Sequence, residues 1–289
     1  MKAMLFSRKG LAFALLGLLA GCQSNPSAIL PTEPAGSAKT ATDLRFRIKR
    51  TIADGDCGGL GPLYVSTDFT YKTARNLATA VTFPPNAAVR SATFQYAYDA
   101  QGQLSTITLP YQLPQQNGDV AEVSYYTVAA DAIRVQHDWL RADGGRRIGA
   151  DPKQVITYSL KDGLITEQTF PFRAFGQDFT GKVTYTYANG NVVRAQQTTP
   201  VGNMEFTYEY DDKPNPFFGW LYTKGPTLSP ELLCSRNNIV RTTVTDQSGT
   251  PNATTYAVQT AYTYNEQGLP LTRRAGAKAC TLTFEYETY

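Results

Sequence analysis

The sequence predicts an all-β domain of about sixteen antiparallel strands, joined as an up-and-down meander of hairpins and curled into a barrel-like sheet. Short segments alternate aromatic or β-branched residues with polar ones, and Gly-containing turns separate them at nearly regular intervals. No long segment beyond the first twenty residues repeats its apolar residues with the period of a helix. An open sheet of this size would expose its aromatic face to water, so we expect it to curl.

One hairpin pattern recurs along the chain. In Phe94–Leu104 an alternating strand runs into a polar turn with Asp99 and Gly102, and a second strand follows. Similar segments lie at 71–77, 158–165, 183–192, 206–211 and 262–270. Gly supplies the positive φ of such a turn, and a preceding Asp or Asn can accept hydrogen bonds from its backbone.

The pattern also predicts where each strand runs. The expected strands are 45–51, 63–71, 77–83, 90–98, 103–109, 120–127, 132–140, 153–159, 164–172, 178–187, 191–199, 203–210, 239–246, 253–264, 269–275 and 279–287. Counted this way, every Asp- or Asn-type turn follows an even-numbered strand. All of these turns are therefore expected at the same rim of the meander.

The first 22 residues have the organisation of a bacterial lipoprotein leader. A basic start precedes the apolar run Leu11–Ala20, which is too short to span a bilayer, and Leu19–Cys22 reads Leu-Ala-Gly-Cys, a lipobox. We therefore expect a signal peptide at residues 1–21 and acylation of Cys22. Residues 22–42, rich in Ser, Pro, Ala and Thr, are expected to be a flexible tether, and residues 43–289 one β domain.

The charge balance argues against nucleic acid as a partner. The chain has 27 Lys and Arg against 24 Asp and Glu, and three of the basic residues (Lys2, Arg8 and Lys9) belong to the leader. The mature chain is therefore formally neutral, without the excess of positive charge that phosphate binding needs. The expected partner is the membrane, through the N-terminal lipid.

Three cysteines follow Cys22, and the compartment outside the inner membrane is oxidising. The strand count places Cys57 and Cys280 at the rim opposite the Asp/Asn turns. If the ends of the sheet meet, these two can form a disulfide. Cys234 is expected at the other rim, out of easy reach of both, as the leftover thiol. A fully reduced set is the alternative.

The hairpins resemble the YD repeats of Rhs-type bacterial proteins. A closer resemblance is to a family of bacterial lipoproteins of unknown function whose domain is described as porin-like. It is carried by the lipobox, by Tyr208–Phe217 (Tyr-Glu-Tyr-Asp-Asp-Lys-Pro-Asn-Pro-Phe), by Asn237 and Asn238, and by Tyr262–Pro270. The resemblance implies a curled, many-stranded sheet and no particular activity.

Residues that could carry catalysis are scarce, and we expect a protein that is not an enzyme and needs no cofactor. The single histidine, His137, excludes His-based zinc sites of the usual spacing, and its neighbour Asp138 should point to the opposite face of its strand. Asp54 and Asp56, like Asp211, Asp212 and Asn215, are oxygen-rich, yet turn capping explains both groups better than Ca²⁺ binding does.

The best candidate for a ligand site is the insertion at residues 212–238, which interrupts the hairpin pattern. Its candidate ligand-binding residues are Asp212, Lys213, Asn215, Phe217, Trp220 and Tyr222. Aromatic rings beside amide and carboxylate groups suit a sugar or peptide. The alternative is a plug whose aromatics cover the open end of the curled sheet.

Together these features predict a lipid-anchored lipoprotein of the bacterial outer membrane, facing the periplasm or the outside, that acts as a non-enzymatic binding or structural module for a glycan or protein ligand. One alternative is a transmembrane β-barrel, because residues 281–289 alternate and end in an aromatic; the Tyr-rich strands argue against a lipid-facing wall. The other is a glycan-acting hydrolase that uses unidentified carboxylates.

Overall fold

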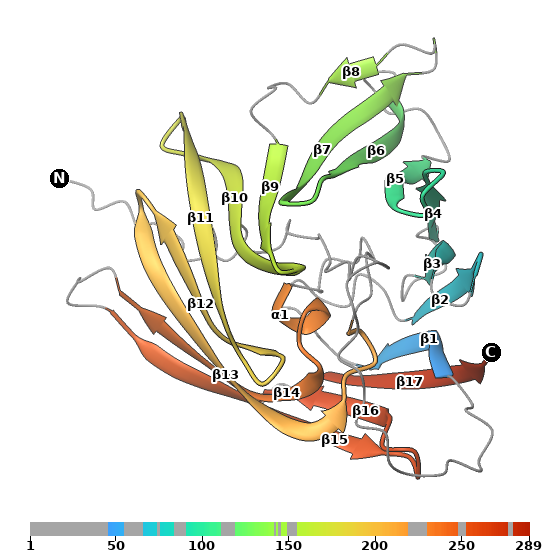
Figure 1. Cartoon of the computed structure of the whole chain (residues 1–289), viewed down its shortest axis with the longest axis vertical. Coiled ribbons are helices and arrows are strands. Elements are labelled where there is room, and N and C mark those ends of the chain that lie inside the picture. The colour runs from blue at the N-terminus through green and yellow to red at the C-terminus, as the bar shows by residue number, and fades with distance from the viewer. Residues whose placement is uncertain are drawn as a thin grey trace, which may run out of the picture.

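The computed structural model describes residues 46–54, 66–73, 76–83, 91–110, 119–141, 143, 146–148, 155–218, 230–247, 253–276 and 280–289. These residues form seventeen strands and one short helix, arranged around a ring (Figure 1). The elements are β1 (Phe46–Asp54), β2 (Ser66–Tyr71), β3 (Leu77–Phe83), β4 (Ala92–Tyr98), β5 (Leu104–Pro110), β6 (Asp119–Val128), β7 (Ala132–Arg141), β8 (Arg146–Ile148), β9 (Val155–Lys161), β10 (Leu164–Ala174), β11 (Gln177–Ala188), β12 (Asn191–Thr199), β13 (Gly202–Pro214), α1 (Pro230–Leu233), β14 (Asn237–Asp246), β15 (Thr255–Tyr264), β16 (Pro270–Ala275) and β17 (Cys280–Thr288). No helix among the described residues is long and apolar enough to cross a membrane.

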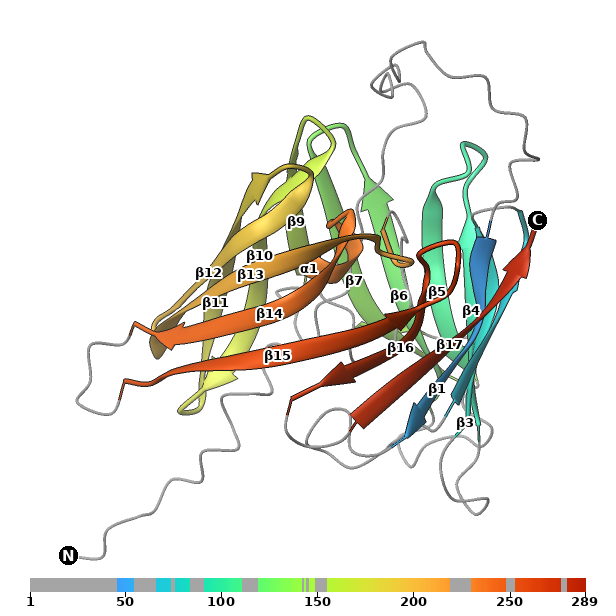
Figure 2. The ribbon, with the colours of Figure 1, turned by 90° about the horizontal axis from the view of Figure 1, so that it is seen from below.

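Sixteen of the strands close into an antiparallel barrel with up-and-down connections, which confirms the predicted fold class. Strand β1 pairs with both β2 and β17, so the first and last strands meet and the circuit is complete (Figure 2). The additional strand is β8. It pairs with one end of β7, whereas β9 pairs with the other end and continues the ring.

Each of the sixteen predicted strands has a counterpart in the barrel, and the Asp- and Asn-type turns lie at one rim, as the count predicts. We call this the turn rim and the other the opposite rim. Three features were not predicted: β8, α1, and the extension of β13 to Pro214, where it pairs with Asn237 at the start of β14. The extension of β13 depends on a contact across the insertion, and β8 depends on pairing with the end of β7.

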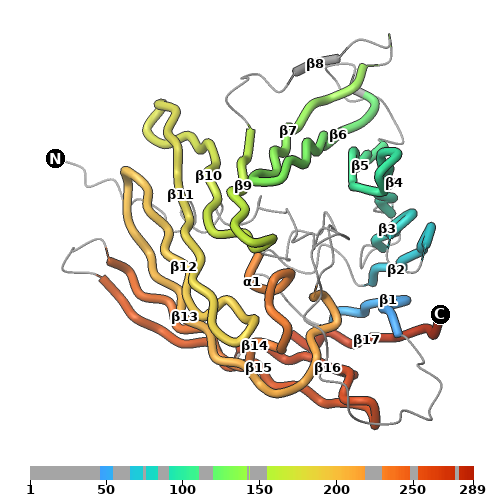
Figure 3. The backbone as a smooth tube through the Cα atoms, viewed as in Figure 1, coloured from blue at the N-terminus to red at the C-terminus, as the bar shows by residue number. Residues whose placement is uncertain are grey.

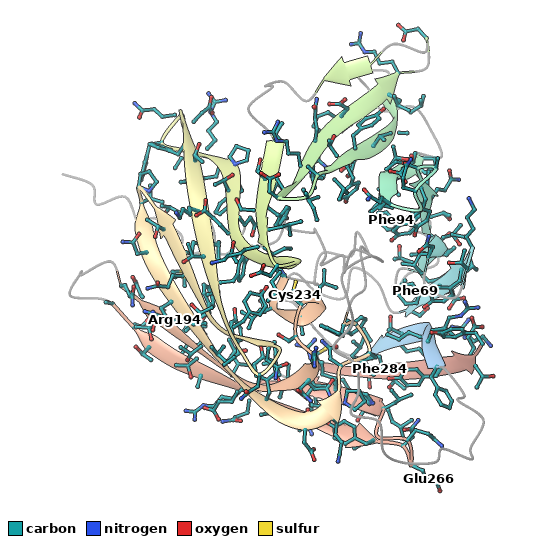
Figure 4. The ribbon with its side chains drawn as sticks, viewed as in Figure 1. Phe69, Phe94, Arg194, Cys234, Glu266 and Phe284 are labelled. Carbon is teal, nitrogen blue, oxygen red and sulfur yellow. The ribbon has the colours of Figure 1, made fainter. Side chains whose placement is uncertain are left out.

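The aromatic and aliphatic residues face the inside of the ring. The most deeply buried side chains include Ile48, Leu104, Tyr158 and Val192, one from each of four strands. Phe69 and Phe94 point from their strands toward the centre of the ring, where Cys234 also lies (Figure 4). The backbone trace shows α1 in the same place, inside the ring (Figure 3). The strand alternation therefore separates a buried inner face from an outer face rich in Thr and charged residues.

The closing seam between β1 and β17 is held by side chains as well as by the backbone ladder. Arg47 donates to the Glu287 carboxylate at 2.6 Å, and its guanidinium lies over the Tyr71 ring, 4.1 Å from the centroid. On the inner side, the Tyr71 hydroxyl donates to the Ile48 carbonyl at 2.5 Å. The contacts join β1 to both of its neighbours.

Candidate functional site

The turns of the turn rim explain the recurrent hairpin pattern. The Asp99 carboxylate accepts two backbone N–H groups of its own turn at 2.8 and 2.9 Å, and the Asn265 side chain accepts two at 2.8 and 3.1 Å. Gly102 and Gly268, three residues later, both have φ of 76°. This left-handed conformation favours Gly, so the turn needs Asp or Asn first and Gly fourth.

Tyrosine hydroxyls tie neighbouring strands together along the same rim. Five of them donate to a backbone carbonyl near the start of the preceding strand, at 2.5–3.0 Å: Tyr71, Tyr98, Tyr187, Tyr210 and Tyr286. Burial raises the pKa of Tyr98 to about 12, so the phenol remains a donor at all physiological pH values. Tyr264 differs, because its hydroxyl donates to the Asp211 carboxylate.

Asp211 marks the point where the insertion leaves the barrel wall. Its carboxylate accepts the backbone N–H of Asn238 at 3.1 Å and the Asn238 side-chain amide at 3.2 Å, in addition to the Tyr264 hydroxyl. The backbone N–H of Lys213 donates to it at 3.0 Å. Asp211 therefore joins the two ends of the insertion to each other and to β15, and its oxygens are occupied by structural hydrogen bonds.

Asn215 fixes the next part of the insertion from inside. Its side-chain N–H₂ donates to the carbonyls of Leu232 at 2.5 Å and Ser235 at 2.8 Å, and its oxygen accepts the backbone N–H of Phe217 at 3.0 Å. The residue is buried. A buried amide with all of these partners stabilises the chain around it, since leaving such a group unpaired is costly.

The described part of the insertion packs into the barrel. Phe217 is 6 % exposed and meets the Phe284 ring edge-on, with the centroids 5.8 Å apart. Leu232 and Leu233 of α1 belong to the same apolar cluster as the inner wall. The described ends of the insertion therefore pack against the inner wall, and the plug stays a prediction.

Glu231 on α1, a half-buried residue, places a carboxylate beside the tyrosines of the inner wall, and it was not among the predicted site residues. Burial raises the pKa of the Tyr208 phenol well above its ordinary value, and the Glu231 carboxylate beside it raises that pKa further. The same carboxylate acts in the same direction on Tyr185, Tyr187 and Tyr210. Pro230 followed by an acidic residue is a recognisable helix start, but the sequence does not show that this carboxylate lies beside the tyrosines.

Two of the remaining candidate ligand-binding residues, Asp212 and Lys213, have exposed side chains. The Asp212 side chain is 84 % exposed and pairs with the Lys213 ammonium at 3.3 Å. Phe218, which follows Phe217, is also exposed and lies under the Arg236 guanidinium. Trp220 and Tyr222 lie outside the described residues. Ligand binding by the insertion thus stays a prediction, while Asn215 and Phe217 have structural roles.

The cysteines differ from expectation in one respect. Cys22 and Cys57 are not among the described residues, so acylation and the Cys57–Cys280 disulfide stay predictions. Cys234 and Cys280 are both disulfide-bonded, and the expectation that Cys234 is the leftover thiol is wrong. That expectation assumed that Cys234 stays at the turn rim; instead α1, which precedes it, lies inside the ring (Figure 3), and Cys234 is buried.

The His137 side chain is largely enclosed by the wall and contacts a buried serine. Its Nδ1 atom lies 2.9 Å from the Ser124 hydroxyl on β6, while Asp138 accepts the Gln136 side-chain amide at 3.1 Å. Burial lowers the pKa of His137. Ser124 is itself buried, so this pair offers no accessible nucleophile. Within the described residues no group of three or more His, Cys, Asp or Glu side chains could hold a metal ion.

Comparison with known proteins gives structural neighbours of low identity, among them two porin-like proteins. No family model matches the chain, and no curated protein matches it significantly. It is similar to a porin-like protein from Bacteroides vulgatus ATCC 8482, with 12 % identity and a TM-score of 0.36, over 84 % of this chain and 99 % of that one. For a porin-like protein from Bacteroides uniformis ATCC 8492, the identity is 14 % and the TM-score 0.32, over 84 % and 98 % of the two chains.

Proposed function

We propose that the protein is a lipid-anchored lipoprotein of the bacterial outer membrane whose barrel stands in water and acts as a non-enzymatic binding or structural module. The lipobox that ends at Cys22 supports the anchor. Gln23, rather than Asp, after the acylated cysteine favours sorting to the outer membrane. The observation that best supports a barrel in water is that charged side chains lie on the outer face of the wall and apolar side chains on the inner face.

Charged pairs cross the outer face in the middle of the strands. Lys182 pairs with Glu167 at 2.6 Å, and Arg241 pairs with Glu209 at 3.2 Å. Arg194 and Glu205 form a third pair on the β12–β13 ladder. A barrel that spans a bilayer needs an outward apolar band about 25 Å tall and a polar interior. This wall has the reverse arrangement, which suits water outside and a packed core inside.

Anchoring can be tested on the full chain expressed in a bacterium with an outer membrane. We expect incorporation of radiolabelled palmitate and recovery in the outer-membrane fraction, both lost in Cys22→Ser. A wild-type chain that takes up no label would contradict the anchor. Resistance of the Cys22→Ser protein to extraction from membranes without detergent would indicate a lipid-embedded barrel instead.

The binding role can be tested with a glycan array probed by the mature protein. If the insertion presents a sugar platform, we expect a signal that Trp220→Ala abolishes. Phe218→Ala is the matched control, because Phe218 is an exposed aromatic of the same segment. Without any signal, the glycan role is wrong and the module is structural or binds a protein.

A further inference from the structure

The hairpin turn between β10 and β11 contains an unexpected residue. Three two-residue turns of the barrel have nearly the same backbone: Asp162 and Gly163 have φ of 54° and 75°, Asn189 and Gly190 have 53° and 78°, and the β10–β11 turn has 51° and 76°. The first two use Asp and Asn, which tolerate positive φ. The third uses Phe175, a bulky side chain for which this conformation is unfavourable.

The Phe175 side chain is not buried in the interior, so packing does not offset the unfavourable backbone conformation. It is 80 % exposed, the highest value among the large apolar side chains described, and Tyr256 at 54 % is second. Both residues lie at the opposite rim. Behind the tip, Phe172 and Phe179 stack with their centroids 5.5 Å apart and brace the hairpin. An exposed aromatic at a strained position indicates a contact outside the molecule.

We propose that Phe175 inserts into the bilayer to which the acylated Cys22 tethers the protein, so that the opposite rim rests on the membrane surface. This inference rests on the lipid anchor proposed above. An aromatic ring beside a cation is typical of membrane interfaces, and the Arg173 side chain, 73 % exposed, lies next to the tip, where it pairs with the Asp178 carboxylate at 3.7 Å. A protein partner normally needs about 800 Å² of contact surface, more than one hairpin apex presents.

The predicted tether is long enough for this orientation. Phe46, at the start of β1, lies at the turn rim, because it pairs with Thr288 at the end of β17. The residues between Cys22 and Phe46 can span roughly 75 Å when extended, at about 3.3 Å a residue. The 12-residue strand β11 spans roughly 40 Å by the same measure. The anchor therefore permits either rim to face the bilayer.

The test uses the mature, lipidated protein in vesicles of phosphatidylethanolamine and phosphatidylglycerol. Phe175→Trp places a fluorescent probe at the tip, and Asn189→Trp places one in the same kind of turn at the turn rim. Both variants keep the native Trp139 and Trp220, whose emission is subtracted using the wild type. We expect a blue shift of the probe at position 175 and its quenching by brominated lipids, and neither effect at position 189.

Each other outcome overturns the proposal. A probe at position 175 that emits as in water, while the protein floats with the vesicles, would exclude insertion and leave a protein pocket as the occupant. Equal quenching of both probes would refute the orientation. Failure of the wild type to float would overturn the lipid anchor, and this contact with it.

Discussion

Replacing Phe175 with Asn is expected to stabilise the barrel, although the change removes a large apolar side chain. An L-residue in the left-handed region costs about 1–2 kcal/mol, and Asn pays less of this because its short polar side chain suits that conformation. Phe175 is 80 % exposed, so its removal uncovers little buried surface. We expect a net gain of about 1 kcal/mol in the free energy of unfolding.

The assay is reversible unfolding of the protein by urea and by heat. A gain of this size corresponds to a rise in Tm of about 2–4 °C for a domain of 150–250 residues. Phe175→Ala keeps a Cβ at positive φ without the amide, so it should gain less. The reciprocal change Asp162→Phe should lose a similar amount. If Phe175→Asn is no more stable than the wild type, or if Ala equals Asn, the strain argument is refuted.

Three further predictions concern the wall. Gly181→Ala should lose about 1–3 kcal/mol in urea unfolding, because its Cβ would overlap with Cζ of the buried Phe170 ring, and Phe170→Leu should reduce that loss. Tyr187→Phe should lower the free energy of unfolding by about 1 kcal/mol, because it removes the 2.8 Å hydrogen bond to the Ile165 carbonyl. An unchanged Tm would show that this hydrogen bond does not stabilise the wall. Burial lowers the pKa of His137, so below pH ~6.5 the unfolded chain takes up a proton that the native state resists. The free energy of unfolding should therefore fall between pH 7 and 5, and a slope unchanged in His137→Gln would assign the effect to another group.

The barrel wall was predictable because its causes are local. Alternation of residues such as Phe206, Tyr208 and Tyr210 marks a strand with one aromatic face, and Asp99 with Gly102 is sufficient to make a turn. The short strand β8 has no such signal and depends on pairing with β7. Local chemistry therefore accounts for the sixteen strands and for the rim that carries the turns.

The candidate site was only partly predictable. The insertion was recognisable because it interrupts the hairpin pattern, and Asp212, Lys213, Asn215 and Phe217 fall within its described part. The pattern could not show that Asn215 would be buried against Leu232, because the two residues are 17 positions apart and meet only when the segment turns inward. Whether this segment packs against the inner wall or stays outside depends on the barrel around it, and no local sequence pattern shows that.

The strands, their turns and the side chains that share a face follow from alternation and backbone conformation within a few residues, so they could be predicted before the fold was known. Three features depend on contacts across the whole chain: β1 and β17 meet, the aromatic face is the inner one, and α1 fills part of the interior. Closure depends on the accumulated twist and register of all sixteen strands. Closure could therefore not be predicted from any single segment of the chain.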